Sequence, residues 1–285
     1  MTTELTTIDQ KELDDFVNAA GIDAEDLNGA TDYLPQLKVN YNEENPETKK
    51  ELKKGTFFLT GQDVTVYAKS VTIRPLLQHF QWTEWSKVEK KTVNRTKFIV
   101  NFSEEAIDEK GTVKCGKPLS KEFKNNPALV EKWDHVKCSR TLHVLVSYEG
   151  EDEDGNKHTV SNVLATMRLK GANFNPFKEE FIDNMPKGSK LWDYEITLGT
   201  TREKNDPNSA NSFFVIHFDA DFTKRVPVTR EVFDQAKAAQ ARIEEFNSDV
   251  EVAYVKAVSA RNTSDSAIDA LEDTGASLED DLVDA

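Results

Sequence analysis

The chain has 285 residues, of which 38 % are hydrophobic and 31 % charged, and its formal net charge is −15. This composition is typical of a polar globular protein, and no window is apolar enough over the length of a membrane span. Two cysteines, Cys115 and Cys138, are too few for a disulfide framework. The first residues contain neither a basic flank nor an apolar run, so we expect no secretory signal. We expect a cytoplasmic location.

The charge is unevenly distributed along the chain. Residues 1–32 have a net charge of −8 and residues 231–285 one of −10, whereas residues 33–230 hold 31 basic and 28 acidic side chains. The pattern indicates a slightly basic body with acidic ends, which is compatible with an anionic partner. The alternative is that the acidic ends serve solubility alone.

The predicted elements begin with an acidic N-terminal helix at 7–20 and a polar linker, which together make up residues 1–32. A strand-like segment at 33–41 follows, and alternating apolar residues then predict strands up to about residue 219. Asp154-Gly155 is a hairpin turn signal, and Pro176 opens a short helix at 175–185. We expect a mainly β fold with flanking helices and a β-barrel over residues 33–228. The predicted strands are 56–60, 64–74, 77–85, 95–102, 139–148, 158–170, 191–199 and 212–219.

Apolar residues at three- and four-residue steps predict a long helix over 229–262, with a point at Asn247-Ser248 where it could break. Residues 263–285 contain eight carboxylates and no basic residue. Such a composition buries too little apolar surface to form a core, so it predicts a disordered acidic tail.

Alternation along strands places side chains on opposite faces. If Val71 and Ile73 point inward, Arg74, Phe80 and Trp82 lie on the other face, provided that Pro75 does not shift the register. Aromatic rings beside cations are what base stacking and phosphate contact require. The alternative is that these rings fill the core. The predicted stacking residues are Phe80, Trp82 and Trp85, and the predicted phosphate contacts are Arg74, Arg95, Lys97, Arg168 and Lys170.

Catalytic and metal-binding patterns are incomplete in this sequence. Gly111–Pro118 resembles a phosphate-binding P-loop but has Pro118 where a hydroxyl is needed. Cys115, His135 and Cys138 offer three ligands without a clear fourth, so buried cysteines are favoured over zinc, with a metal site left open. We therefore expect no enzyme and no cofactor.

The chain resembles phage-encoded single-stranded DNA-binding proteins. The likeness is carried by the segment 33–41 followed by Gly55-Thr-Phe-Phe58, by the aromatic strands, by the long helix and by the acidic end at 277–285. It implies an oligonucleotide/oligosaccharide-binding (OB) barrel and an acidic tail that binds replication and recombination proteins in the host cytoplasm. In this chain the tail residues are Leu278, Asp280, Asp281 and Leu282. A homodimer stays open.

The function expected from these features is sequence-independent binding and protection of single-stranded DNA in phage replication and recombination. The alternative is an acidic protein-interaction factor, an inhibitor or DNA mimic that binds a host DNA-binding protein. A mimic should be acidic over its body, whereas residues 33–230 carry a net charge of +3. A nuclease would need clustered carboxylates, which the sequence does not locate.

Overall fold

The computed structural model describes residues 34–118, 122, 126–204 and 212–279, with side chains as far as residue 262. The predicted helix at 7–20 and the linker before Tyr33 lie outside the described residues. So do the tail residues Asp280, Asp281 and Leu282, and nothing is described of the Leu278 side chain.

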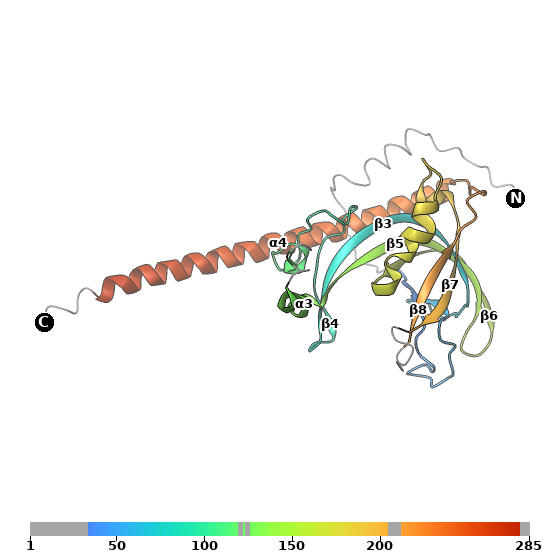
Figure 1. Ribbon diagram of the computed structural model, residues 1–285, viewed down its shortest axis with the longest axis horizontal. Helices are drawn as coiled ribbons and strands as arrows, with labels where there is room; N and C mark the ends of the chain where they lie inside the picture. The colour runs from blue at the N-terminus through green and yellow to red at the C-terminus, as the bar shows by residue number, and fades with distance from the viewer. Residues whose placement is uncertain (1–33, 119–121, 123–125, 205–211, 280–285) are drawn as a thin grey trace. The chain divides into compact units, whose positions relative to one another are not determined.

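The fold is mainly β, as the sequence predicts. Six antiparallel strands form one sheet in the order β6-β5-β3-β7-β8, with β4 paired to β3, and the described strands leave this sheet open rather than closed into a barrel (Figure 1). β1 and β2 form a separate two-stranded sheet. The strands are β1 (Leu37–Val39), β2 (Phe57–Leu59), β3 (Val71–Ser86), β4 (Lys91–Arg95), β5 (Val136–Glu151), β6 (Lys157–Leu169), β7 (Ile196–Glu203) and β8 (Phe213–Asp219).

The strand boundaries differ from the prediction at Pro75, which lies inside one continuous strand instead of separating two. β7 pairs with Val71–Ile73 and β4 with Thr83–Ser86. Pro75 lies between these two paired stretches, so its missing N–H removes no ladder hydrogen bond on that edge. The β5–β6 hairpin, by contrast, is confirmed, with Gly155 at a positive φ of 81° in its turn.

Helices in the described residues are short except for the last one. Pro176 is the N-cap of η3, which confirms a short helix within the predicted 175–185 segment. Thr229 accepts a hydrogen bond from the backbone N–H of Val232 and so caps the long α4. The elements are η1 (Lys114–Gly116), α3 (Pro127–Trp133), η2 (Gly171–Asn173), η3 (Phe177–Phe181), η4 (Ile182–Asn184), η5 (Leu191–Asp193) and α4 (Arg230–Glu279).

The end of α4 also differs from the prediction. The helix continues through Asn247-Ser248 and extends to Glu279, where the sequence predicts a disordered tail from 263. The composition of this segment argues against a packed core, but its alanine, leucine and glutamate residues favour local helix. No helix among the described residues is long and apolar enough to cross a membrane.

The chain divides into two compact units. Unit 1 contains the chain up to Phe80, Val100–Phe102 and Cys138–Glu245, and unit 2 contains Gln81–Ile99, Ser103–Lys137 and the chain from Phe246. In unit 1, side chains of β3, β5, β6 and β7 form the core with two rings of η3. Fully buried members include Ile73, Leu142, Val144, Met167, Ile196, Phe177 and Phe181.

The part of α4 that belongs to unit 1 covers the other face of its sheet. It buries Val232, Phe233, Ala236 and Ile243. The charge of Arg242 contributes to the low pKa of His143 on β5, which places these helical turns beside that strand. Both sheet faces are therefore covered here, which explains why β5 is buried at every position from Ser139 to Val146.

Unit 2 is held together by the later part of α4. The Asn247 side chain accepts from the backbone N–H of Phe98 at 2.7 Å and donates to its carbonyl at 3.1 Å. The rings of Phe98 and Phe246 lie 5.0 Å apart. Asn247, where a helix break was considered, thus supplies the pairing that residue 98 would have had in a strand. The predicted strand at 95–102 is not formed, and β4 ends at Arg95.

Candidate nucleic-acid interface

Trp82 is the first predicted stacking residue that the structure places beside cations. Thr96 fixes its backbone, because the Trp82 N–H donates to Thr96 Oγ1 and the Thr96 N–H donates to the Trp82 carbonyl, both at 3.0 Å. The Nζ atoms of Lys114 and Lys117 lie 5.7 and 5.4 Å from the centre of its half-buried ring. Trp82 therefore has a fixed backbone and two cations at its ring face.

A tight turn positions these two lysines. Lys114, Cys115 and Gly116 have positive φ angles of 48°, 57° and 69°, so η1 is a left-handed turn that ends at Lys117. A Cβ on Gly116 would lie 3.2 Å from the Trp133 ring, a tight contact, and the positive φ would strain any other residue. The segment that resembles a P-loop is therefore a turn between two indole rings, Trp82 and Trp133.

Trp85 is the more exposed of the two strand tryptophans, with 48 % of its surface accessible. Its N–H donates to the carbonyl of His135, and a register shift after Glu84 changes the alternation at this end of β3. Trp85 lines a pocket of about 430 Å³ together with Glu84, Ser86, Lys87, Glu89, Val93, Lys110 and His135. An exposed indole is thus held in a concave site beside basic side chains.

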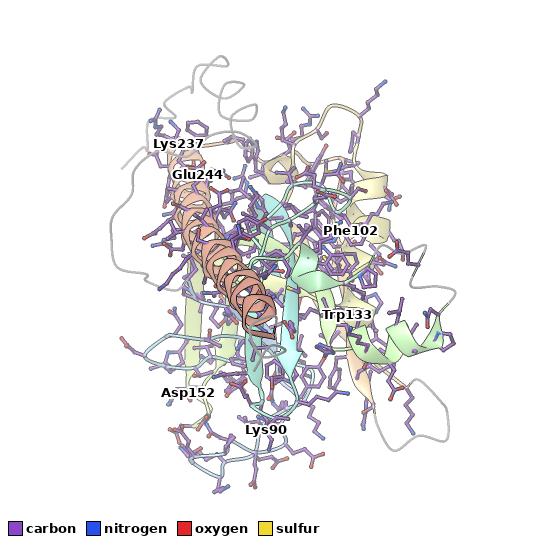
Figure 2. The ribbon with its side chains drawn as sticks, turned by 90° about the vertical axis from the view of Figure 1, so that its left-hand side faces the viewer. Lys90, Phe102, Trp133, Asp152, Lys237 and Glu244 are labelled. Atoms are coloured by element: carbon purple, nitrogen blue, oxygen red, sulfur yellow. The ribbon has the colours of Figure 1, made fainter. Side chains whose placement is uncertain are left out.

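Trp133 extends this surface. Its ring stacks on His135 with centroids 6.0 Å apart, and Lys132 Nζ lies 5.1 Å from its centre (Figure 2 labels Trp133). We call Trp82, Trp85 and Trp133, with Lys114, Lys117 and Lys132, the tryptophan surface of unit 2. Trp133 and the three lysines were missed by the sequence analysis. Tryptophan and lysine are residue types that suit nucleic-acid binding. The Lys-rich segment before β5 has no periodicity, however, from which the direction of its side chains could be predicted.

Arg95 and Lys97, two predicted phosphate contacts, lie in the same unit but are paired with carboxylates. Arg95 Nε is 2.6 Å from Glu109 and its guanidinium lies over the Phe246 ring. Lys97 Nζ is 3.0 Å from Glu251. A strand with Arg95 and Lys97 outward would bury Val100 and Phe102, but these are 51 % and 44 % exposed and Ile99 is buried. Both cations help to dock α4 within unit 2.

Arg74 and Phe80 in unit 1 do not lie on an exposed face as predicted, since they are only 7 % exposed each. The Arg74 guanidinium donates to the carbonyls of Trp192, Val226 and Pro227 at 2.7–3.0 Å. Burial lowers the pKa of Arg74, which the nearby Glu195 and Asp193 partly offset. Arg74 therefore links three chain segments through hydrogen bonds. It is buried because both faces of the sheet are covered, whereas the sequence analysis expected one face to be open.

Phe80 instead belongs to a cluster around Arg140. The Arg140 guanidinium lies 5.2 Å from the ring centres of Phe80 and Phe174 and 5.7 Å from that of Phe177. We call these residues, with Phe102, the Arg140 cluster. Arg140 shares its face of β5 with the core residue Leu142, so Phe80 lies on the core face that Ile73 also occupies. The alternation on β3 therefore shifts between Ile73 and Phe80, the stretch that contains Pro75.

Burial of the Arg140 charge is energetically expensive. Arg140 is only 5 % exposed, and burial lowers its pKa. Each cation–π contact returns about 0.5–2 kcal/mol, whereas removing an ion from water costs several kcal/mol. Phe102, Phe174 and Arg140 were missed as site residues because this cluster joins segments far apart in sequence.

Arg168 and Lys170, the last two predicted phosphate contacts, point outward at the end of β6. Both are exposed, whereas Ala165, Met167 and Leu169 on the alternate positions of β6 are buried. Thr141 pairs with Arg168 in the β5–β6 ladder. Their contact with phosphate stays a prediction.

No group of three or more histidine, cysteine or acidic side chains that could hold a metal ion occurs among the residues the structure describes. Burial, aided by Asp108 and Glu84, raises the pKa of the Cys115 thiol and keeps it protonated. Comparison of the chain with protein-family models, with curated proteins and with solved structures found no match.

Proposed function

We propose that the chain binds single-stranded DNA with little sequence preference, by stacking bases on indole rings and neutralising phosphates with lysines. The observation that carries this proposal is Trp85, which is 48 % exposed in a pocket that also contains Lys87 and Lys110. Glu84 and Glu89 line the same pocket, and Lys110 Nζ lies 3.1 Å from Glu84, so a phosphate would compete with this carboxylate for Lys110. An exposed indole in a concave site offers a face on which a base can stack, and a lysine beside it favours an anionic ligand.

The net charge of unit 2 before α4 also favours an anionic partner such as DNA. Residues 81–99 and 103–137, the part of unit 2 that precedes α4, hold twelve lysines and arginines and nine carboxylates, a net of +3. A DNA mimic would need the opposite sign on this surface. The resemblance adds the wider proposal of a non-catalytic, phage-type replication or recombination protein with an OB-like core. In that proposal, residues from Leu278 to Leu282 would contact replication partners.

The test is a titration of the full chain with oligo-dT at low salt, followed by tryptophan fluorescence, with duplex DNA of equal length as competitor. We expect tighter binding to the single strand and a fall of log affinity with log salt of about 0.7 per phosphate neutralised. Equal affinity for duplex, or no binding to either, contradicts the proposal.

Trp85→Ala sharpens the test. Loss of one stacking ring should weaken binding by about 1–3 kcal/mol without unfolding the protein, because the side chain is exposed. Val88→Ala is the matched control, since Val88 is in the same unit and 92 % exposed but has no ring. If the two variants bind oligo-dT equally, the pocket at Trp85 is not the binding site.

A further inference from the structure

Arg140 differs from the other buried arginine of unit 1 in what its donors contact. Arg74 donates through Nε and Nη2 to three backbone carbonyls. Arg140 donates through Nη1 to Gln78 Oε1 at 2.6 Å, but its buried Nε has no acceptor among the described residues. Since buried donors in native proteins nearly always have a partner, this guanidinium N–H requires an acceptor that the described residues do not supply.

The charge of Arg140 is also uncompensated. No carboxylate of the described residues forms an ion pair with it. Cys138 and Asp183 act against the lowering of the Arg140 pKa, but Cys138 is no carboxylate and Asp183 is bound by Lys178 at 2.6 Å. The three rings around the guanidinium present faces but no acceptor atoms, so an anion is the missing partner.

Aromatic rings lead from this guanidinium to the surface. Phe80, Phe102 and Phe174 form a triangle with centroids 5.8–6.0 Å apart. Phe80 is buried, Phe174 is half-buried and Phe102, which Figure 2 labels, is 44 % exposed. Phe102 lies in the short segment Val100–Phe102, in which all three residues are exposed. A flat aromatic ligand would therefore meet ring faces immediately beside a cation.

We propose that the Arg140 cluster binds one nucleotide unit, with the base stacked on the exposed ring of Phe102 and the phosphate accepting from Arg140 Nε. This inference rests on the proposed function for its macromolecular ligand, a single DNA strand, but the site is separate from the tryptophan surface. The planar guanidinium of arginine matches the geometry of phosphate oxygens. A charged acceptor also offsets the free energy that is lost when the Arg140 charge is buried.

The experiment compares Arg140→Met with the wild-type chain. Methionine keeps much of the volume but removes the charge, so the variant should melt at an equal or higher temperature and bind oligo-dT about tenfold more weakly. A second measurement follows the melting temperature with thymidine monophosphate and with thymidine. We expect the monophosphate alone to stabilise the wild-type chain, and neither compound to stabilise Arg140→Met.

Phe102→Ala keeps the inference testable if Arg140→Met does not fold, with Val100→Ala as the matched exposed control. Weaker oligo-dT binding by Phe102→Ala but not by Val100→Ala supports the site. Equal binding by both, or unchanged binding by folded Arg140→Met, overturns it. If the wild-type chain binds no oligo-dT yet thymidine monophosphate stabilises it through Arg140, the proposed function fails and the site stands for a free nucleotide.

Discussion

The tryptophan surface of unit 2 and the Arg140 cluster of unit 1 both combine aromatic rings with cations, but they differ in how much of that charge meets water. In unit 2 the cations are lysines on a turn and a short helix, and Trp85 is 48 % exposed. In unit 1 a single guanidinium lies under phenylalanine rings and is 5 % exposed.

This difference has a consequence for salt dependence. Lys132 is exposed and Lys114 and Lys117 are half-buried, so solvent and salt reach these charges more than that of Arg140, and counterion release contributes more to phosphate binding. A buried guanidinium interacts at low dielectric through a directed hydrogen bond that salt weakens much less. We therefore expect changes in unit 2 to alter the salt slope of DNA binding, and changes at Arg140 to alter affinity at every salt concentration.

The largest expected effect is the loss of stability at low pH that follows from two buried histidines in unit 1. His79 and His143 are 4 % exposed, and burial lowers their pKa values to about 4 and about 3, with His79, Arg168 and Arg242 lowering that of His143 further. The unfolded chain therefore takes up protons first below pH 6.5, and stability falls as the pH decreases. We expect a loss of about 2 kcal/mol per histidine between pH 6.5 and 5.

Urea unfolding at several pH values between 7 and 5 measures this loss, in a range where carboxylates stay ionised. His143→Leu should flatten the dependence, because it removes one of the two protonations. A slope that is unchanged in this variant would show that the pair does not control the acid response.

The second effect distinguishes the two buried arginines. Arg74→Met removes the donors from three carbonyls, one of them fully buried, and should lower the free energy of unfolding by about 3 kcal/mol. Arg140→Met should leave it unchanged or raise it. Equal losses in the two variants would mean that Arg140 is a structural residue like Arg74.

The sequence predicted the class of the fold better than the site. Alternation located the β5–β6 hairpin and the outward positions of Arg168 and Lys170, because this ladder keeps one register up to Val146. It failed on β3, where the alternation shifts between Ile73 and Phe80. A local pattern does not contain that shift, nor does it reveal that α4 covers the second face.

The acid-rich end shows a different limit. Composition described residues 263–285 as unable to form a core, which says nothing about local helix formation, and α4 reaches Glu279. Conversely, the three cations of the tryptophan surface lie in a segment without periodicity. Lys114 and Lys117 meet the Trp82 ring only through the left-handed turn at Lys114–Gly116, which no pattern in the sequence predicts.

A smaller effect is expected at that turn. Changing Lys114 and Lys117 together to glutamine removes two cations from the Trp82 ring. The salt slope of oligo-dT binding should become shallower by about 1.4, which is about 0.7 for each lost phosphate contact. Lys224→Gln in unit 1, an 81 % exposed lysine paired with Asp221, is the matched control. An unchanged slope would remove both lysines from the interface.

The smallest effect concerns the acidic end, because its action depends on charge alone. Residues 263–285 bring eight carboxylates into the same molecule as the cationic surface, so they compete with DNA at an effective concentration that can approach the millimolar range. Deleting them should strengthen oligo-dT binding a few-fold at low salt. The gain should vanish near physiological ionic strength, where the Debye length is about 8 Å. A full-length variant with the eight carboxylates changed to amides separates charge from length and should behave like the deletion. Parallel salt titrations of the three proteins decide the matter: equal affinities at all salt concentrations would show that the acidic end does not compete with DNA.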